Sequence, residues 1–289
     1  MPDWLINFPF EATFDPGAID RVIRNFSDQF SAFFDAIRIG LSSMVITVNN
    51  ILDYFPWWLL MILIFIRGWK VSGKISRGVL YAALLSFVGI VGLWDQMTET
   101  LAIVIVSVIL SILFGFPLGV WMAWSDRVNR LIVPVLDTMQ TMPIFVYLIP
   151  AIVFFGLGRA PAVIATTIYA IVPLIRLTSL GIRQIDAEVV EAAKAFGSTT
   201  MQALVKVQIP QAMPTIMAGV NQTLMMAMAM VVTCSMIGAN GLGMEVLRAV
   251  NRIDMGRGLI AGTCVVIVAI LLDRLMQRSG KGGKDAHND

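Results

Sequence analysis

The residue types that most often catalyse reactions or bind metals are scarce in this chain. Its one histidine, His287, lies in a polar stretch near the end of the sequence, and its two cysteines, Cys234 and Cys264, lie in apolar runs. A single histidine makes no metal site. The sequence contains neither a phosphate-binding Gly-Lys-Ser/Thr loop nor a serine–histidine–aspartate set. We therefore expect no catalytic residue, no metal and no cofactor on this chain.

A patterned segment between two long uncharged stretches carries the most specific spacing in the sequence. It begins with a Glu-Ala-Ala triplet, reaches a glycine after three more residues, and ends in an apolar-x-apolar-proline sequence. The spaced residues are Glu191, Ala192, Ala193, Gly197, Val207, Ile209 and Pro210. A patterned loop between two membrane spans is suited to contact a protein outside the membrane.

Two short helices should form within this segment, residues 186–206. Ala187–Phe196 favours a helix, with acidic residues near its start where the helix dipole favours them. Gly197 should end that helix, and Ser198 or Thr199 can cap a second one over Met201–Val207, which a proline then closes. The small side chains of the first helix would let another surface approach closely.

The composition places the chain in a membrane. Hydrophobic residues make up 57% of its 289 residues and charged residues 14%, with a mean hydropathy of +0.80. Soluble domains average about 45–50% apolar residues and about 25% charged residues. The formal net charge of +2 is too small to indicate a nucleic-acid partner.

About seven segments are candidates for crossing the membrane, since a span needs about 20 mostly apolar residues. They are Tyr54–Ile66, Gly78–Trp94, Thr100–Ser125, Thr138–Gly158, Ala160–Ile175, the first part of Val207–Met244, and Gly258–Leu272. The first is short and needs Trp57 and Trp58 as interfacial anchors. The uncharged run from Val207 is too long for one crossing, so the glycine cluster at 238–243 should end its helix.

Residues 1–55 should form an amphipathic helical region and not a span. Apolar residues recur every three or four positions between Ile19 and Phe55, and charged residues such as Asp20 and Arg38 occupy the other face. Such helices can lie in the membrane interface, pack across the transmembrane bundle, or form a soluble hairpin. A transmembrane domain over 56–278 and a polar cytoplasmic tail over 279–289 complete the expected organisation.

The distribution of lysine and arginine predicts the orientation. With the N-terminus outside and the C-terminus inside, most of the 21 basic residues fall in cytoplasmic segments, as the positive-inside rule requires. Arg248, Arg252 and Arg257 oppose the rule, because they share one outer loop. Arg176 lies within a span and should face the bundle or snorkel. This orientation puts the Glu191 segment in the cytoplasm.

The complete spacing from Glu191 to Pro210 resembles the coupling loop of ABC-importer permeases. Val207 and Ile209 stand where that family usually has isoleucine and leucine. Three further segments of this chain narrow the resemblance to the permease subunits of glycine betaine/proline betaine importers. These segments are Leu136–Pro143, Ala212–Leu224 and Arg252–Gly256, and the similarity covers residues 54–278. Related choline and trimethylamine N-oxide importers share much of the pattern.

This resemblance implies an all-α, polytopic protein of the bacterial inner membrane with the type I ABC-importer permease fold. It implies a non-catalytic subunit that works as a homodimer, surrounded by lipid, with two ABC ATPase subunits that hold ATP and magnesium. A separate extracytoplasmic binding protein would deliver a quaternary-amine solute. The alternative is a secondary transporter or channel acting without an ATPase; these usually show internal repeats or intramembrane acids, and neither is evident here.

Six residues are candidates for lining the translocation path. They are Asp137, Gln140, Met142, Asn221, Gln222 and Met225. The first two lie close to Pro143 and could equally hydrogen-bond a broken helix. The two amides after Val220 lie at membrane depth, where amides usually face other helices. The methionines around them could form an adaptable gate or fill space between helices.

Overall fold

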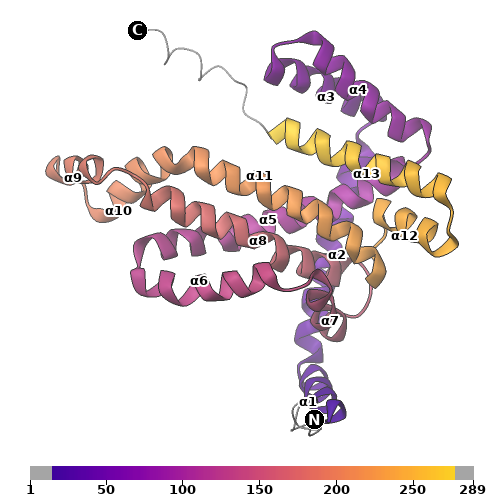
Figure 1. Ribbon diagram of the computed structural model, residues 1–289, viewed down its shortest axis with the longest axis horizontal. Coiled ribbons are helices and arrows are strands. Elements are labelled where there is room, and N and C mark those ends of the chain that lie inside the picture. Colours follow the sequence, from indigo (N-terminus) through magenta and orange to yellow (C-terminus); the bar gives the residue numbers. More distant parts are fainter. Residues whose placement is uncertain (1–14, 277–289) are drawn as a thin grey trace, which may run out of the picture.

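The computed structural model describes residues 15–276, and every regular element in that range is helical, as expected (Figure 1). The expected polar tail, with His287, lies outside the described residues. The elements are α1 (Pro16–Gln29), α2 (Ser31–Tyr54), α3 (Trp57–Ser72), α4 (Ile75–Ile90), α5 (Trp94–Trp124), α6 (Asp126–Thr141), α7 (Ile144–Phe155), α8 (Arg159–Arg183), α9 (Ala187–Ala195), α10 (Thr200–Ala203), the π-helical turn η2 (Leu204–Gln208), α11 (Ile209–Thr233), the 3-10 turn η3 (Cys234–Ile237), α12 (Leu242–Arg252) and α13 (Met255–Met276).

Helix α8 packs along both α5 and α11, and these three helices form the centre of the bundle (Figure 1). Two glycines of α5 let it approach α8 closely. A Cβ at Gly115 would lie 2.8 Å from Ile171 Cγ1, and one at Gly119 would lie 2.7 Å from Thr178 Cβ. Small residues spaced by four are a common contact between membrane helices, because they allow close backbone approach.

The expected span Thr138–Gly158 is bent sharply. Its two parts, α6 and α7, meet at an angle of 99° at Met142 and Pro143. A proline has no N–H and disfavours helical geometry in the preceding residue, and Met142 is accordingly extended, with φ −69° and ψ 131°. The Tyr147 hydroxyl of α7 donates to the Met139 carbonyl of α6, which fixes the two helices across the break.

Within residues 15–276, five helices are long and apolar enough to cross a membrane, or six if the bent pair is one span. The sequence predicts about seven. Two of the expected spans, Tyr54–Ile66 and Gly78–Trp94, correspond to α3 and α4, which have 16 residues each. Such helices extend about 24 Å at 1.5 Å per residue, less than the roughly 30 Å of hydrocarbon. They pack on each other and against α13 (Figure 1).

The N-terminal region differs from the expectation that residues 1–55 contain no span. Helix α2 has 24 residues and is apolar enough to cross a membrane. Figure 1 shows it running across the α5–α8 pair, against which it packs. Its start is held to α7 by stacking of Phe34 on Phe154, with ring centroids 4.9 Å apart. Packing across the bundle was one of the alternatives that the amphipathic pattern left open.

The second half of the fold contains one continuous helix of 38 residues, from Thr200 to Ile237. The expected end of a helix at Pro210 is therefore wrong. A π-helical turn precedes the proline, and the Ile209 N–H donates to the Leu204 carbonyl, five residues back. Proline is tolerated in the first turn that follows, so α11 continues. The glycine cluster at 238–243 ends this long helix and begins α12, as expected.

Candidate functional site

The segment that carries the Glu-Ala-Ala spacing forms a helix, a glycine turn and a second helix. Asp186 caps α9, because its side chain accepts a hydrogen bond from the Glu188 N–H at 3.0 Å. Gly197 follows α9 with a left-handed φ of 85°. Thr199 and Gln202 then form a reciprocal capping box at the start of α10, with bonds of 2.9 and 3.3 Å. Local sequence signals therefore set the shape of this unit.

The α9–α10 unit, residues 186–203, exposes most of its surface. Glu191, Ala192 and Gly197 are exposed and Ala193 is half-buried, and no residue of α9 is fully buried. Sequence reasoning missed Phe196, whose side chain is 92% exposed directly before the turn. An aromatic residue beside a helix-breaking glycine was the available signal. An exposed ring of this size, next to small side chains, is suited to enter a recess on a partner.

The apolar end of the motif connects the exposed α9–α10 unit to the bundle. Ile209 packs against a buried cluster that includes Ile182 of α8 and Leu204 of η2, and Val207 is half-buried. Pro210 lies exposed in the first turn of α11. The motif therefore divides into an exposed part on α9 and a packed part that connects it to the bundle.

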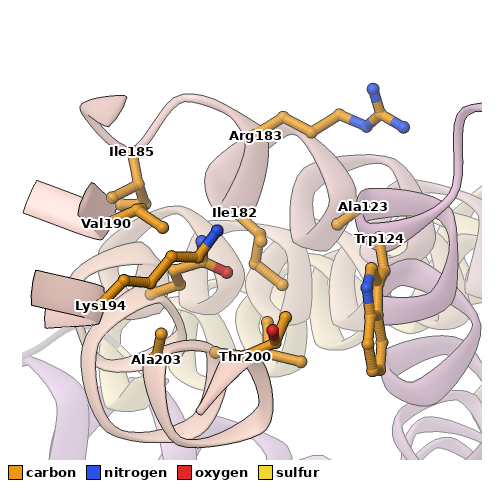
Figure 2. A pocket seen from close by; sticks show the side chains of 11 residues that line it. Ala123, Trp124, Ile182, Arg183, Ile185, Val190, Lys194, Thr200 and Ala203 are labelled. Atoms are coloured by element: carbon orange, nitrogen blue, oxygen red, sulfur yellow. The ribbon is translucent and has the colours of Figure 1, made fainter. Parts of the chain in front are cut away.

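A small cavity of about 250 Å³ lies between this unit and the ends of α5 and α8 (Figure 2). Figure 2 shows Lys194 of α9 and Ile182 of α8 pointing into the same space, with the Trp124 ring on the opposite wall. The guanidinium of Arg183 extends away from this space. The contact between the unit and the bundle is therefore partly hollow.

Arg183 joins three helices at this end of the bundle. Its Nη1 donates to Asp126 Oδ1 of α6 at 2.7 Å, and its Nη2 donates to the Met122 carbonyl of α5 at 2.7 Å. It stands at the C-terminal end of α8 and Asp126 at the N-terminal end of α6, so both charges complement the helix dipoles. The helix that leads into the α9–α10 unit is therefore tied to its neighbours.

The residues considered for the translocation path do not form one cluster. Asp137 of α6 forms an ion pair with Arg176 of α8, which confirms that this arginine faces another helix. Gln140 is exposed on α6, and Met142 lies at the α6–α7 break, partly buried against the main core. The Asp137 carboxylate therefore has a structural partner within the chain.

The candidates on α11 divide between two of its faces. Asn221 bonds to Asp273 of α13, with 2.8 Å between Nδ2 and Oδ1. Gln222 and Met225 lie on an exposed stripe of α11, together with Ala218 and other residues at helical spacing. The amide of Asn221 thus joins two helices of the same chain, whereas the other two side chains face outward.

Residues 115–282, more than half of the chain, match the family described as binding-protein-dependent transport system inner membrane component. The chain belongs to this family. It is a multi-pass permease of the inner membrane. The α9–α10 unit, α11, α12 and α13 all lie within the matched residues.

Three curated relatives cover most of the permease. The permease is 47% identical over 261 residues to the glycine betaine transport system permease protein OpuAB of Bacillus subtilis, and the alignment covers 90% of this chain and 92% of that protein. It is 46% identical over 271 residues to the glycine betaine/carnitine transport permease protein GbuB of Listeria monocytogenes, with coverages of 92% and 95%. It is 42% identical over 286 residues to the glycine betaine/proline betaine permease protein ProW of Escherichia coli, with coverages of 97% and 79%.

Solved structures support the fold of the permease. Two inward-facing crystal forms of the MetNI methionine ABC transporter contain a chain that superposes with TM-scores of 0.54 and 0.56, at 23% identity. The match covers 65% of the permease and 91% or 96% of the other chain. This structural similarity confirms the expected ABC-importer permease fold.

Proposed function

We propose that the permease imports a small quaternary-amine solute of the glycine betaine type, driven by ATP hydrolysis on a partner subunit. The names of the three relatives above support the solute class, since each includes glycine betaine. More distant relatives named for trimethylamine N-oxide and carnitine transport carry the same kind of methylated amine. The permease contributes the pore and no chemistry.

The position of the α9–α10 unit is the observation that carries the coupling mechanism. It projects from one end of the bundle, beyond the ends of α5 and α8 (Figure 1). Its exposed acidic, small and aromatic side chains suit it to contact an ATPase. The unit is continuous with α8 on one side and, through η2, with α11 on the other. A displacement of the unit would therefore move two of the three central helices.

The mechanism is alternating access with the N-terminus outside and the C-terminus inside. Each chain has one coupling unit and ABC ATPases act in pairs, so two copies of the permease assemble with two ATPases. ATP binding closes the ATPases, the α9–α10 units move, and the pore opens toward an extracytoplasmic binding protein. Hydrolysis then returns it to the inward-facing state.

The exposed face of α11 is the part of the chain that we assign to the path. Gln222 and Met225 face away from the protomer, where a second copy or the solute would meet them. Gln140 on α6 and Met142 at the helix break lie on other elements, and we assign them to the path as separate positions. Asp137 and Asn221 act instead through their partners on α8 and α13, by fixing the helices that carry the path.

The coupling proposal is tested with purified permease, ATPase and binding protein reconstituted in membranes. Gly197→Trp and Glu191→Lys should uncouple ATP hydrolysis from solute uptake, because both change the exposed contact surface while leaving membrane insertion intact. Solute-stimulated ATPase activity at the wild-type level in both variants would contradict the proposal. The solute class is tested by binding of labelled glycine betaine, choline and trimethylamine N-oxide to the partner binding protein.

A further inference from the structure

The turn between α12 and α13 contains an unusual backbone conformation. Among the described residues other than glycine, Ile253 alone has a positive φ, with φ 54° and ψ 34°. The Ile253 N–H donates to the Val250 carbonyl and the Asp254 N–H to the Ala249 carbonyl, at 3.1 and 2.9 Å. This left-handed helix ending usually has glycine at this position, since a β-branched side chain disfavours it. The conformation therefore carries a conformational cost that glycine would avoid.

Within residues 15–276, no packing of the Ile253 side chain offsets this cost. The Ile253 side chain is 93% exposed, and Val250, Met255 and Leu259 beside it are also strongly exposed. These four residues, which we call the α12–α13 tip, line a shallow recess of about 380 Å³. A strained backbone conformation that packing within the protein does not stabilise is characteristic of functional sites.

The charges around the tip are paired except at one position. Arg248 pairs with Glu245, and Arg257 pairs with Asp254 at 3.4 Å. Arg252, directly before Ile253, is exposed and forms no ion pair within residues 15–276. Arginine is enriched among the residues that dominate protein–protein binding, and Arg252 lies beside the exposed apolar side chain of Ile253.

The tip lies at the opposite end of α11 from the α9–α10 unit (Figure 1). If the coupling unit is cytoplasmic, the tip faces the outer side of the membrane, where the neighbouring Arg248, Arg252 and Arg257 run against the usual distribution of basic residues. A contact that needs positive charge explains the placement of Arg252, which has no ion pair within the described residues.

We propose that the α12–α13 tip is a docking point for the extracytoplasmic binding protein, an inference that rests on the proposed function. The complementary surface is a carboxylate that binds Arg252 beside an apolar recess that receives Ile253. The tip is also firmly connected to the bundle. The Leu242 N–H at the start of α12 donates to Thr100 Oγ1 of α5 at 2.8 Å, and the Ile237 carbonyl before α12 accepts from the Gly158 N–H, next to α8, at 2.9 Å. Docking would thus act directly on the outer ends of α5 and α8.

The test titrates solute-loaded binding protein against the complete importer in lipid nanodiscs and follows stimulated ATP hydrolysis. Ile253→Gly relieves the backbone strain and removes the apolar side chain. It should raise the half-saturating concentration of binding protein about tenfold, as expected for a dominant contact residue. Its unfolding temperature should equal or exceed that of the wild type. Arg252→Gln should act in the same direction, whereas the matched control Ile253→Leu keeps the apolar contact and should resemble the wild type.

Two results would overturn the docking proposal. The first is an unchanged half-saturating concentration in both Ile253→Gly and Arg252→Gln while the wild type responds normally. The second is a change in the number of permease copies per nanodisc in Ile253→Gly, which would make the tip an interface between copies. A wild-type importer that no concentration of binding protein stimulates would contradict the proposed function itself, so the two failures are distinguishable.

Discussion

Asn221 of α11 and Asp273 of α13 are joined by a hydrogen bond of 2.8 Å, in which the amide Nδ2 donates to the carboxylate Oδ1. The Asn221 Oδ1 is buried and accepts no hydrogen bond from the described residues. Because α11 continues directly from α10 and η2, this bond connects α13 to the helix that carries the coupling unit. An amide that could have faced the solute therefore holds two helices together.

Exchanging the two groups tests this connection. Asn221→Asp places two carboxylates within hydrogen-bond distance and removes the donor, so the free energy of unfolding should fall by about 2 to 3 kcal/mol. Adding Asp273→Asn restores one donor and one acceptor and should recover most of the loss. Thermal unfolding of the purified permease in detergent measures both. A double variant as unstable as the single one would show that the bond is not the source of the effect.

The ion pair between Asp137 of α6 and Arg176 of α8 predicts a non-additive pair of substitutions. Arg176→Gln leaves the Asp137 carboxylate without its ionic partner, which should cost about 1 kcal/mol of stability. Asp137→Asn combined with Arg176→Gln removes both charges and should cost less than the sum of the single changes. A double-mutant cycle on unfolding in mild detergent gives the coupling energy, and additivity within error would contradict a stabilising pair.

How far the sequence predicts this structure depends on the range of the interactions involved. The predicted helix Ala187–Phe196 differs from α9 by one residue, because Asp186, Gly197 and a threonine cap are local signals. The bond between Arg183 and Asp126 joins residues 57 positions apart, and only the packing of the whole bundle brings their helix faces together. The wrong helix end at Pro210 has a similar origin, since a π-helical turn accommodates the proline in a way that residue propensities do not encode.

The exposed ring of Phe196 should contribute to ATPase binding and not to folding. Since 92% of its surface is exposed, Phe196→Ala should leave the unfolding temperature within about 1 °C of the wild type. Removing an aromatic anchor from an interface typically costs about 2 kcal/mol or more of binding free energy. Co-purification and titration of the ATPase subunit measure this loss. The exposed Met201→Ala on α10 is a control of similar chemistry, and equal losses in both variants would argue against a specific role for the ring.

The turn at Gly197 should depend on backbone conformation and not on space. Its φ of 85° disfavours most side chains, yet among the described residues no atom beyond its own chain neighbours lies within 4 Å of where a Cβ would be. Gly197→Val should therefore destabilise the turn by about 1 to 2 kcal/mol and reduce transport per ATP hydrolysed. Gly197→Asn should be tolerated, because asparagine adopts left-handed conformations more readily. Equal transport ratios in the two variants would show that the left-handed turn is not required for coupling.

At Gly241, next to Thr100, both the backbone conformation and the space for a side chain are restricted. Gly241 has a φ of 118°, and a Cβ there would lie 2.4 Å from Thr100 Oγ1, the atom that accepts the Leu242 N–H. Gly241→Ala should therefore displace the start of α12 and lower the free energy of unfolding by about 3 kcal/mol. Thr100→Val removes the acceptor and leaves the buried Leu242 N–H unpaired, at a cost of about 1 to 3 kcal/mol, whereas Thr100→Ser keeps the hydroxyl and should cost less. Thermal unfolding ranks the three variants, and a Thr100→Val variant as stable as Thr100→Ser would mean that the hydroxyl does not hold α12 in place.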